Sequence, residues 1–171
     1  PHLFSSAASD VYKRQSITSL LLVILSVFFI IIFFIDLKHF IIPNSLTFPL
    51  MFIGFIKSFD PNLDNFLFPN YINSLIGGVI GYLIIWLIIF VYKKVRNKEG
   101  MGLGDAKLLS AIGFWFGWVS IPFVLFLSSV IALGLSLPSL INKSKNLSSQ
   151  IPFGPYIILG ITLYVFIKHM I

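Results

Sequence analysis

The stretch GLGDAKLLSAIGFWFGWVSIPFVLFLSSVIALGLSLPSLIN, residues 102–142, decides the fold. From residue 108 to residue 142 it carries no charged side chain. One helix over that part would measure about 52 Å at 1.5 Å per residue, whereas the bilayer core is about 30 Å thick. Pro122 and the residues just before it therefore predict a break between two helices. The first helix must begin on the GLGD side, which places Asp105 at or just inside the membrane boundary.

The composition of the whole chain is that of a membrane protein. Of its 171 residues, 57% are hydrophobic and 11% are charged, against about 25% charged residues in an average soluble domain. The absence of cysteine excludes disulfides, cysteine-ligated metals and a cysteine nucleophile. The three histidines form no close pair, so we expect no metal site. The net charge is +6, and the basic residues lie between apolar runs, where they orient a chain in the bilayer. We therefore expect no nucleic-acid partner.

Four further apolar runs complete the predicted architecture. They cover residues 16–35, 40–56, 71–92 and 151–167, and the second is expected to give a short helix over about 45–59 that starts at a turn and cap formed by Pro43 and Asn44. The sequence thus predicts an all-α membrane protein with about six transmembrane helices, some of them short or broken by proline. Residues 1–15 resemble translated sequencing-adapter read-through. We expect a non-native or disordered segment there and one membrane domain over residues 16–171.

The basic residues predict the orientation of these helices. With six spans both termini lie on one side, and the loops on the other side hold seven lysines and arginines: Lys38, Lys93, Lys94, Arg96, Lys98, Lys143 and Lys145. The side of the termini holds Lys57 and Lys168, or four basic residues if Lys13 and Arg14 are counted. Because cytoplasmic loops carry the excess of positive charge, the termini are expected outside and the three charged loops in the cytoplasm.

Two of the six acidic residues are unusual because each adjoins a long apolar helix. Asp36 ends the first span and Asp105 begins the fourth, so the predicted topology puts both at the same depth on the same side. An ionisable group at a membrane helix is costly and is by default a hypothesis of function. Two carboxyls that meet there indicate aspartyl protease chemistry, in which one proton is shared and a water is activated. Gly102 and Gly104, just before Asp105, would let backbone approach a substrate closely.

Other roles for the two acids fit the sequence as well. An aspartate at a membrane interface is more often a boundary anchor or a helix cap than a catalytic group, and Asp36 could pair with Lys38. A transporter or a proton-relay protein would also place two acids at such positions. The glycines of the third and fourth spans are typical of helix packing.

Three motifs separate these alternatives. KEGMGLGDAKLLSAIGFWFGW (residues 98–118) resembles the GxGD signature of the type IV prepilin peptidases. IDLKHFIIPNSLTFPL (residues 35–50) resembles the family's other aspartate motif, with proline seven residues after the aspartate. IPFGPYIILG (residues 151–160) resembles its last-helix motif. All three occur in the family's order and together cover most of residues 16–170.

The resemblance implies that Asp36 and Asp105 are the two catalytic aspartates of an intramembrane aspartyl protease. Such enzymes lie in the bacterial cytoplasmic membrane as multi-pass proteins, and they cut the basic leader from prepilins and pseudopilins of type IV pili and type II secretion on the cytoplasmic side. The expected partners are these substrates and the lipid bilayer. Alternatives are a preflagellin peptidase, or a non-enzymatic or transport protein that keeps the scaffold.

The resemblance also implies which cofactors to expect. We expect none for the peptidase reaction. Many relatives also methylate the new N-terminus with S-adenosylmethionine, an activity that goes with an upstream region, usually carrying paired CxxC motifs. The sequence KEGMG (residues 98–102), just before Gly104 and Asp105, resembles that of the bifunctional type. Because the chain has no cysteine, we expect it to be the C-terminal peptidase portion of such an enzyme, without methyltransferase activity.

Overall fold

The computed structural model describes residues 2–61, 63, 67–96, 102–141 and 152–170. Within these ranges the chain is entirely helical apart from its turns. The six helices are α1 His2–His39, α2 Asn44–Lys57, α3 Tyr71–Arg96, α4 Leu103–Phe116, α5 Ser120–Ile141 and α6 Gly154–Met170. The predicted all-helical class and number of helices are confirmed, and so is the break in the uncharged stretch, since α4 ends before Gly117 (φ 80°) and α5 begins at Ser120.

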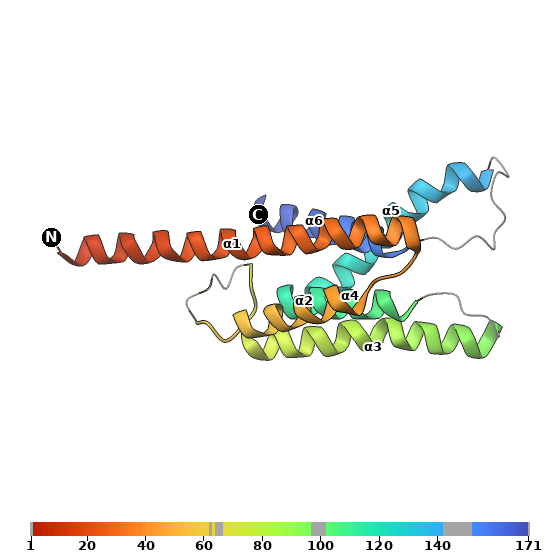
Figure 1. Ribbon diagram of the computed structural model, residues 1–171, viewed down its shortest axis with the longest axis horizontal. Helices are drawn as coiled ribbons and strands as arrows, with labels where there is room; N and C mark the ends of the chain where they lie inside the picture. Colours follow the sequence, from red (N-terminus) through yellow and green to blue (C-terminus); the bar gives the residue numbers. More distant parts are fainter. Residues whose placement is uncertain (1, 62, 64–66, 97–101, 142–151, 171) are drawn as a thin grey trace.

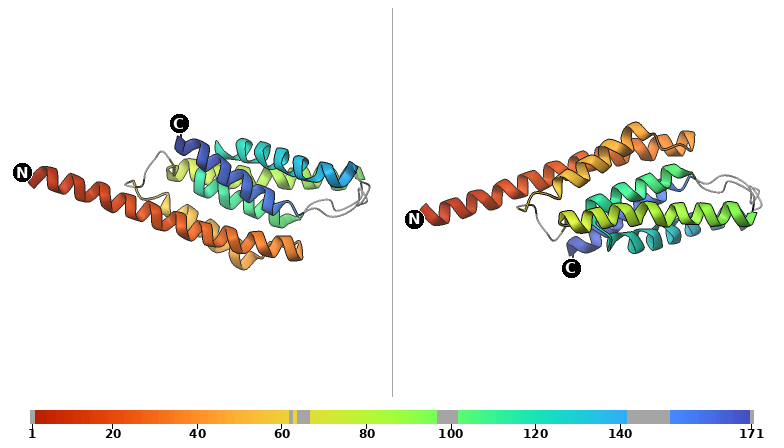
Figure 2. Two further views of the ribbon diagram at one scale, coloured as in Figure 1. Left: turned by 90° about the horizontal axis from the view of Figure 1, so that it is seen from above. Right: turned by 90° about the horizontal axis from the view of Figure 1, so that it is seen from below.

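Successive helices run in alternating directions (Figure 1). The starts of α2, α4 and α6 therefore gather at the same end of the bundle as the last turn of α1, while both chain termini lie toward the opposite end. Figure 2 shows this alternation from two further sides, with α1 extending beyond the other helices at its N-terminal end. The end of the bundle that holds the end of α1 and the starts of α2, α4 and α6 is called the site end below.

Two helix boundaries differ from the expected ones. Helix α2 ends at Lys57, and its N-cap is Pro43 in an extended conformation (φ −72°, ψ 139°) without a side-chain capping bond. The Asn44 amide oxygen instead accepts a hydrogen bond from Lys107 Nζ (2.6 Å). The expected capping role of Asn44 is therefore wrong. Residues 2–15, which we expected to be poorly ordered, form the first part of α1, and their origin stays a prediction.

Helices α3 and α4 approach each other through glycines. A methyl group at Gly113 would collide with the backbone of Gly77, and one at Gly81 would lie 2.7 Å from the Leu109 carbonyl oxygen. Two serines bridge the same interface, because Ser74 Oγ donates to the Phe114 carbonyl (2.7 Å) and Ser110 Oγ to the Gly78 carbonyl (2.7 Å). Small residues with backbone hydrogen bonds are a common way to join helices in a membrane. They place α4 against α3 with almost no space between the backbones.

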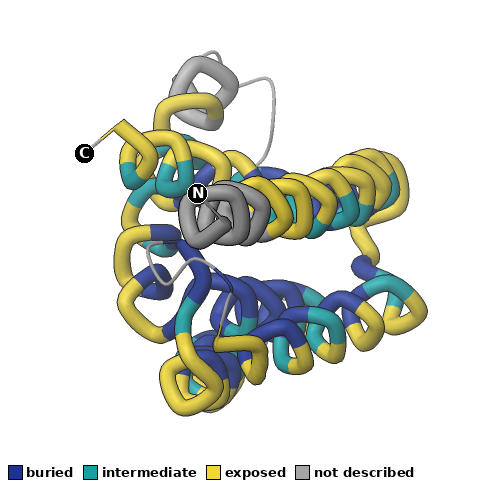
Figure 3. Tube along the Cα trace, turned by 90° about the vertical axis from the view of Figure 1, so that its left-hand side faces the viewer, coloured by how far each residue is buried: buried dark blue, intermediate teal, exposed yellow. Residues whose placement is uncertain are grey.

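The outer surface of the bundle is apolar. Residues 15–39 and 71–95 are long and apolar enough to cross a membrane, and the helical segments Ser120–Leu135 and Gly154–Met170 are shorter and also apolar. Leucine, isoleucine and phenylalanine side chains on the outside of α1, α3 and α5 are about half exposed, and the buried residues lie between the helices (Figure 3). A soluble protein rarely exposes so much apolar area, so this surface indicates contact with lipid.

Lys57 is buried at the opposite end of the bundle. Only 6% of this residue is exposed, and its Nζ donates to the Trp115 carbonyl (2.9 Å) near the end of α4 and lies 3.8 Å from the centroid of the Phe68 ring. A cation at a helix C-terminus is favourable because the last carbonyls lack partners within the helix. The sequence indicated only that Lys57 ends an apolar run on the side of the termini, whereas in the structure its side chain binds the end of α4.

We predict that Gly113→Ala destabilises the protein by about 1–3 kcal/mol, the usual range for overpacking a tight interface. The added methyl group would meet the Gly77 backbone, which can yield only if α3 and α4 move apart. Thermal unfolding in detergent measures the effect. Gly134→Ala is the matched control because its methyl group would meet no atom within 4 Å. Equal melting temperatures for the two variants would contradict the proposed role of the α3–α4 contact.

Candidate active site

Asp36 lies at the end of the buried stripe of α1. This stripe consists of Leu25, Phe29, Ile32 and Asp36, which recur every three or four residues and are all at most 5% exposed. Such spacing puts the four side chains on one face of the helix, and that face packs toward α6. Asp36 therefore points into the protein although the next two residues of α1, Leu37 and Lys38, are exposed.

The chain turns sharply just after Asp36. Phe40 has φ 56°, in the left-handed region that usually suits glycine, and its N–H donates to the Asp36 carbonyl (2.9 Å). A residue in this conformation commonly ends a helix. The turn sends Ile42 back into the bundle, where it is 7% exposed. The local backbone thus places both Asp36 and Ile42 at the site end.

Asp105 reaches the same place from the first turn of α4. Its backbone N–H donates to the Gly102 carbonyl (3.2 Å), and the residue is 7% exposed. Gly104, the neighbour of Asp105, and Gly154, which contacts Asp36, both pack against the Ile42 side chain, so the two acids lie around the same residue. The structure therefore brings together the two acids that the sequence singled out, from helices separated by more than sixty residues of chain.

The first turn of α6 completes this arrangement. The Gly154 N–H donates to Asp36 Oδ2 (3.1 Å) in a buried hydrogen bond. Ile42 lies between the starts of α4 and α6, since methyl groups added at Gly104 and Gly154 would lie 2.9 Å from Ile42 Cβ and 3.0 Å from Ile42 Cδ1. Sequence reasoning missed the roles of Ile42 and of the Gly154 N–H, although Gly154 lies in a motif that it had identified.

The two glycines before Asp105 have different surroundings. The missing side chain of Gly104 makes room for Ile42, so this glycine serves the packing of the site. Gly102 is exposed, and a methyl group there would meet only the Gly104 nitrogen, at 3.8 Å. The approach of substrate backbone to Gly102 and Gly104 stays a prediction.

Neighbouring basic groups do not neutralise the two acids in the described part of the chain. Asp36 and Lys38 are two residues apart and point to different sides of α1, and Lys38 is exposed. Lys107 donates to Asn44 and lies 5.7 Å from the centroid of the Phe48 ring. Among the described residues, no three histidine, aspartate or glutamate side chains could hold a metal ion together. The site offers two carboxyl groups for proton transfer.

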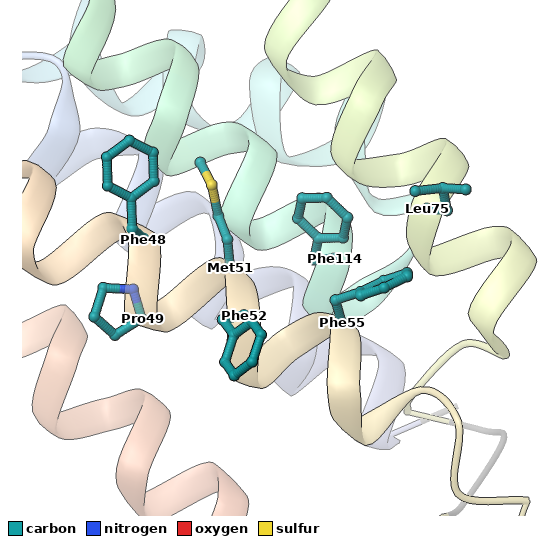
Figure 4. Close-up of a pocket in the computed structure, with 7 residues that line it drawn as sticks. All are labelled: Phe48, Pro49, Met51, Phe52, Phe55, Leu75 and Phe114. Atoms are coloured by element: carbon teal, nitrogen blue, oxygen red, sulfur yellow. The ribbon is translucent and has the colours of Figure 1, made fainter.

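Two pockets of the described structure lie elsewhere. One is an apolar groove of about 700 Å³ between α2, α3 and α4, lined by Phe48, Pro49, Met51, Phe52, Phe55, Leu75 and Phe114 (Figure 4). It has no titratable side chain and opens toward the lipid-facing surface. The other, of about 280 Å³, lies beside Lys57 at the end remote from the two acids. Neither pocket contains Asp36 or Asp105.

Fold and site together define a class, a multi-helix membrane protein that brings two carboxyl groups together at one end of an apolar bundle. The chain belongs to the type IV leader peptidase family, whose profile matches residues 23–137. This match confirms the resemblance found in the sequence motifs. Both acids lie within the matched residues.

Curated relatives support the same assignment. The chain is 39% identical to the prepilin leader peptidase/N-methyltransferase of Aeromonas hydrophila over 126 residues, covering 72% of this chain and 41% of that protein. It is 37% identical to the protein of the same name from Pseudomonas aeruginosa over 123 residues, with the same coverage, and 37% identical to that of Xanthomonas campestris over 135 residues, covering 79% and 45%. The chain thus matches less than half the length of these relatives. No solved structure matches it significantly.

We predict that Gly104→Ala destabilises the protein more than Gly102→Ala does. The first variant forces a methyl group against Ile42 Cβ, close to the backbone, whereas the second adds one to nearly open space. Overpacking of this kind costs about 1–3 kcal/mol, while alanine in place of glycine at an N-cap costs roughly 0.5–1 kcal/mol, because alanine is the poorer N-cap residue. Thermal unfolding of both variants in one detergent provides the comparison. A larger loss for Gly102→Ala would show that Ile42 does not fill the space beside Gly104.

Proposed function

We propose that this chain is an aspartyl endopeptidase that removes the basic leader peptide from type IV prepilins or pseudopilins at the cytoplasmic face of the bacterial inner membrane. The observation that carries the proposal is the meeting of two buried carboxyls, Asp36 and Asp105, at one end of the bundle. Membership of the type IV leader peptidase family supports the substrate class. The names of the relatives support leader cleavage as the reaction.

The chemistry follows from the electrostatics of the pair. Two carboxyls this close in an apolar setting do not both ionise readily, so they share one proton. The ionised carboxylate takes a proton from a water molecule, whose oxygen forms a bond to the scissile carbonyl carbon. The protonated carboxyl donates its proton to the carbonyl oxygen. When the carbon–nitrogen bond breaks, the leaving amine takes the proton that the first carboxyl received from water, and a hydroxyl of the intermediate returns a proton to the second carboxyl. One water is therefore consumed and no cofactor is required.

The position of the site suits a substrate that lies partly in the membrane. The leader proposed for the substrate is basic, and a basic segment stays in water at the membrane surface and not in the apolar layer. A bond at the end of such a leader is therefore within reach of acids at the membrane surface. Asp36 lies in the last turn of α1 and Asp105 in the first turn of α4, where apolar helices end and begin. Lys38 near the end of α1, and Lys93 and Lys94 near the end of α3, lie at the same end of the bundle, which supports a cytoplasmic location.

We predict that Asp36→Asn and Asp105→Asn each lower the rate of leader cleavage by at least about 100-fold, the lower range of general acid–base contributions. Asparagine keeps the size of the side chain but can neither take the proton of the water nor supply one. The measurement is cleavage of a purified prepilin by the chain in detergent, with unfolding curves as a check on folding. Asp60→Asn, at the opposite end of the bundle, is the control and should cleave normally. Full activity in either site variant would remove that residue from the mechanism.

The proposed orientation gives a second prediction. The chain has no cysteine, so single cysteines can be introduced at exposed positions without background. In intact cells, a membrane-impermeant maleimide added outside should label Val119→Cys, in the turn between α4 and α5. It should label Ile41→Cys, at the site end, only after the membrane is permeabilised. The opposite pattern would place the two acids on the outer face and contradict cytoplasmic cleavage.

A further inference from the structure

The two acids are held differently, although both lie at the site end of the bundle. Asp36 Oδ2 accepts the Gly154 N–H at 3.1 Å. In the described part of the chain, the Asp105 carboxyl accepts no hydrogen bond and interacts instead with the charge of Asp36. A hydrogen bond from an N–H favours the ionised form of a carboxylate, and a neighbouring negative charge disfavours it. The surroundings of the pair are therefore asymmetric.

The donor is the first residue of α6, where a helix presents its unpaired N–H groups and the positive end of its dipole. The next residue, Pro155, has no N–H. The two that follow, Tyr156 and Ile157, donate to the Phe153 carbonyl at 3.1 Å. The Gly154 N–H is thus the donor of this turn that points to a tertiary partner. Asp36 caps α6 from a distance of 118 residues in sequence.

Glycine is required at this position by space. A methyl group on Gly154 would lie 2.5 Å from Asp36 Oδ2, 3.2 Å from Asp36 Cγ and 3.0 Å from Ile42 Cδ1. The carboxylate would have to move away and would lose the hydrogen bond. Among the glycines of the described chain, Gly154 is the one at which an added methyl group would meet Asp36.

On the basis of the proposed function, we propose that Gly154 is a positioning residue that gives the two acids different roles. Its N–H keeps the negative charge on Asp36, which is then the base that takes a proton from water. The shared proton stays on Asp105, which is then the acid that donates to the carbonyl oxygen of the substrate. The Asp36 carboxylate also gains a fixed orientation toward the site of attack.

The test measures kcat and KM for leader cleavage by Gly154→Ala and by two other glycine variants of the full chain. Gly154→Ala should lower kcat by about 10- to 100-fold, part of what a positioned base contributes, and change KM less than about threefold, because substrate binding does not use this N–H. Gly160→Ala crowds α6 against Ser128 of α5 without touching Asp36, and Gly134→Ala meets no neighbour within 4 Å. Both should keep a kcat near that of the wild type.

A double variant separates loss of the hydrogen bond from general crowding. Ile42→Ala removes the Cδ1 atom that a methyl group on Gly154 would meet, but the contact with Asp36 Oδ2 remains. The variant Gly154→Ala/Ile42→Ala should therefore lose less thermal stability than the two single variants lose in sum, while its kcat stays low relative to Ile42→Ala alone. Recovery of kcat together with stability would show that Gly154 acts only through packing, and would overturn the inference.

The remaining outcomes are distinct. A wild-type kcat in Gly154→Ala, or an equal loss in Gly160→Ala, would contradict the role of Gly154 while the aspartyl peptidase function stands. Failure of the wild-type chain to cleave any prepilin would contradict the proposed function itself and the inference that depends on it.

Discussion

A short helix inside an apolar bundle must have the polar groups at its ends satisfied by the protein, and α4 is that helix. With 14 residues it is about 21 Å long at 1.5 Å per residue, shorter than the apolar layer. Its last carbonyls find partners in Lys57 Nζ and Ser74 Oγ, which come from α2 and α3. An unsatisfied backbone group in an apolar environment would cost several kcal/mol. These two bonds and the glycine contacts with α3 fix the depth of α4 and therefore the depth of Asp105.

Helix α6 meets the same requirement by different means. Its first free N–H is satisfied by Asp36 of α1, so one hydrogen bond both caps α6 and orients an acid of the site. The space for this bond exists because residue 154 has no side chain. Structural and chemical needs coincide here, since the N–H that this bond satisfies also favours the ionised form of the carboxylate that accepts it. The corresponding acid on α4 belongs to the helix it begins and has no such partner in the described chain.

Sequence patterns predicted most of the architecture because the length of an apolar run and the position of its charges are read directly from the residues. The break at 117–122 followed from the bilayer thickness, and the pairing of Asp36 with Asp105 followed from counting loop charges. Tertiary contacts were outside this reasoning. Lys57 was interpreted only as the charge that ends an apolar run, and nothing local shows that Phe68 and Trp115 lie against it. Asn44 was expected to cap α2, but its side-chain oxygen accepts a hydrogen bond from Lys107, 63 residues away.

The site lies where two groups of helices meet. Helices α2, α3 and α4 pack closely on one another, α5 packs on α6, and α1 packs mainly on α6. Asp105 belongs to the first group and Asp36 to the second, so the distance between the carboxyls depends on how the groups join. At the site end, Ile42 lies between Gly104 of α4 and Gly154 of α6, and it belongs to the short connection that follows Asp36. Ile42, which separates the starts of α4 and α6, is thus only six residues from Asp36 in the chain. A shift of α6 relative to α4 would therefore change the distance between the two carboxyls.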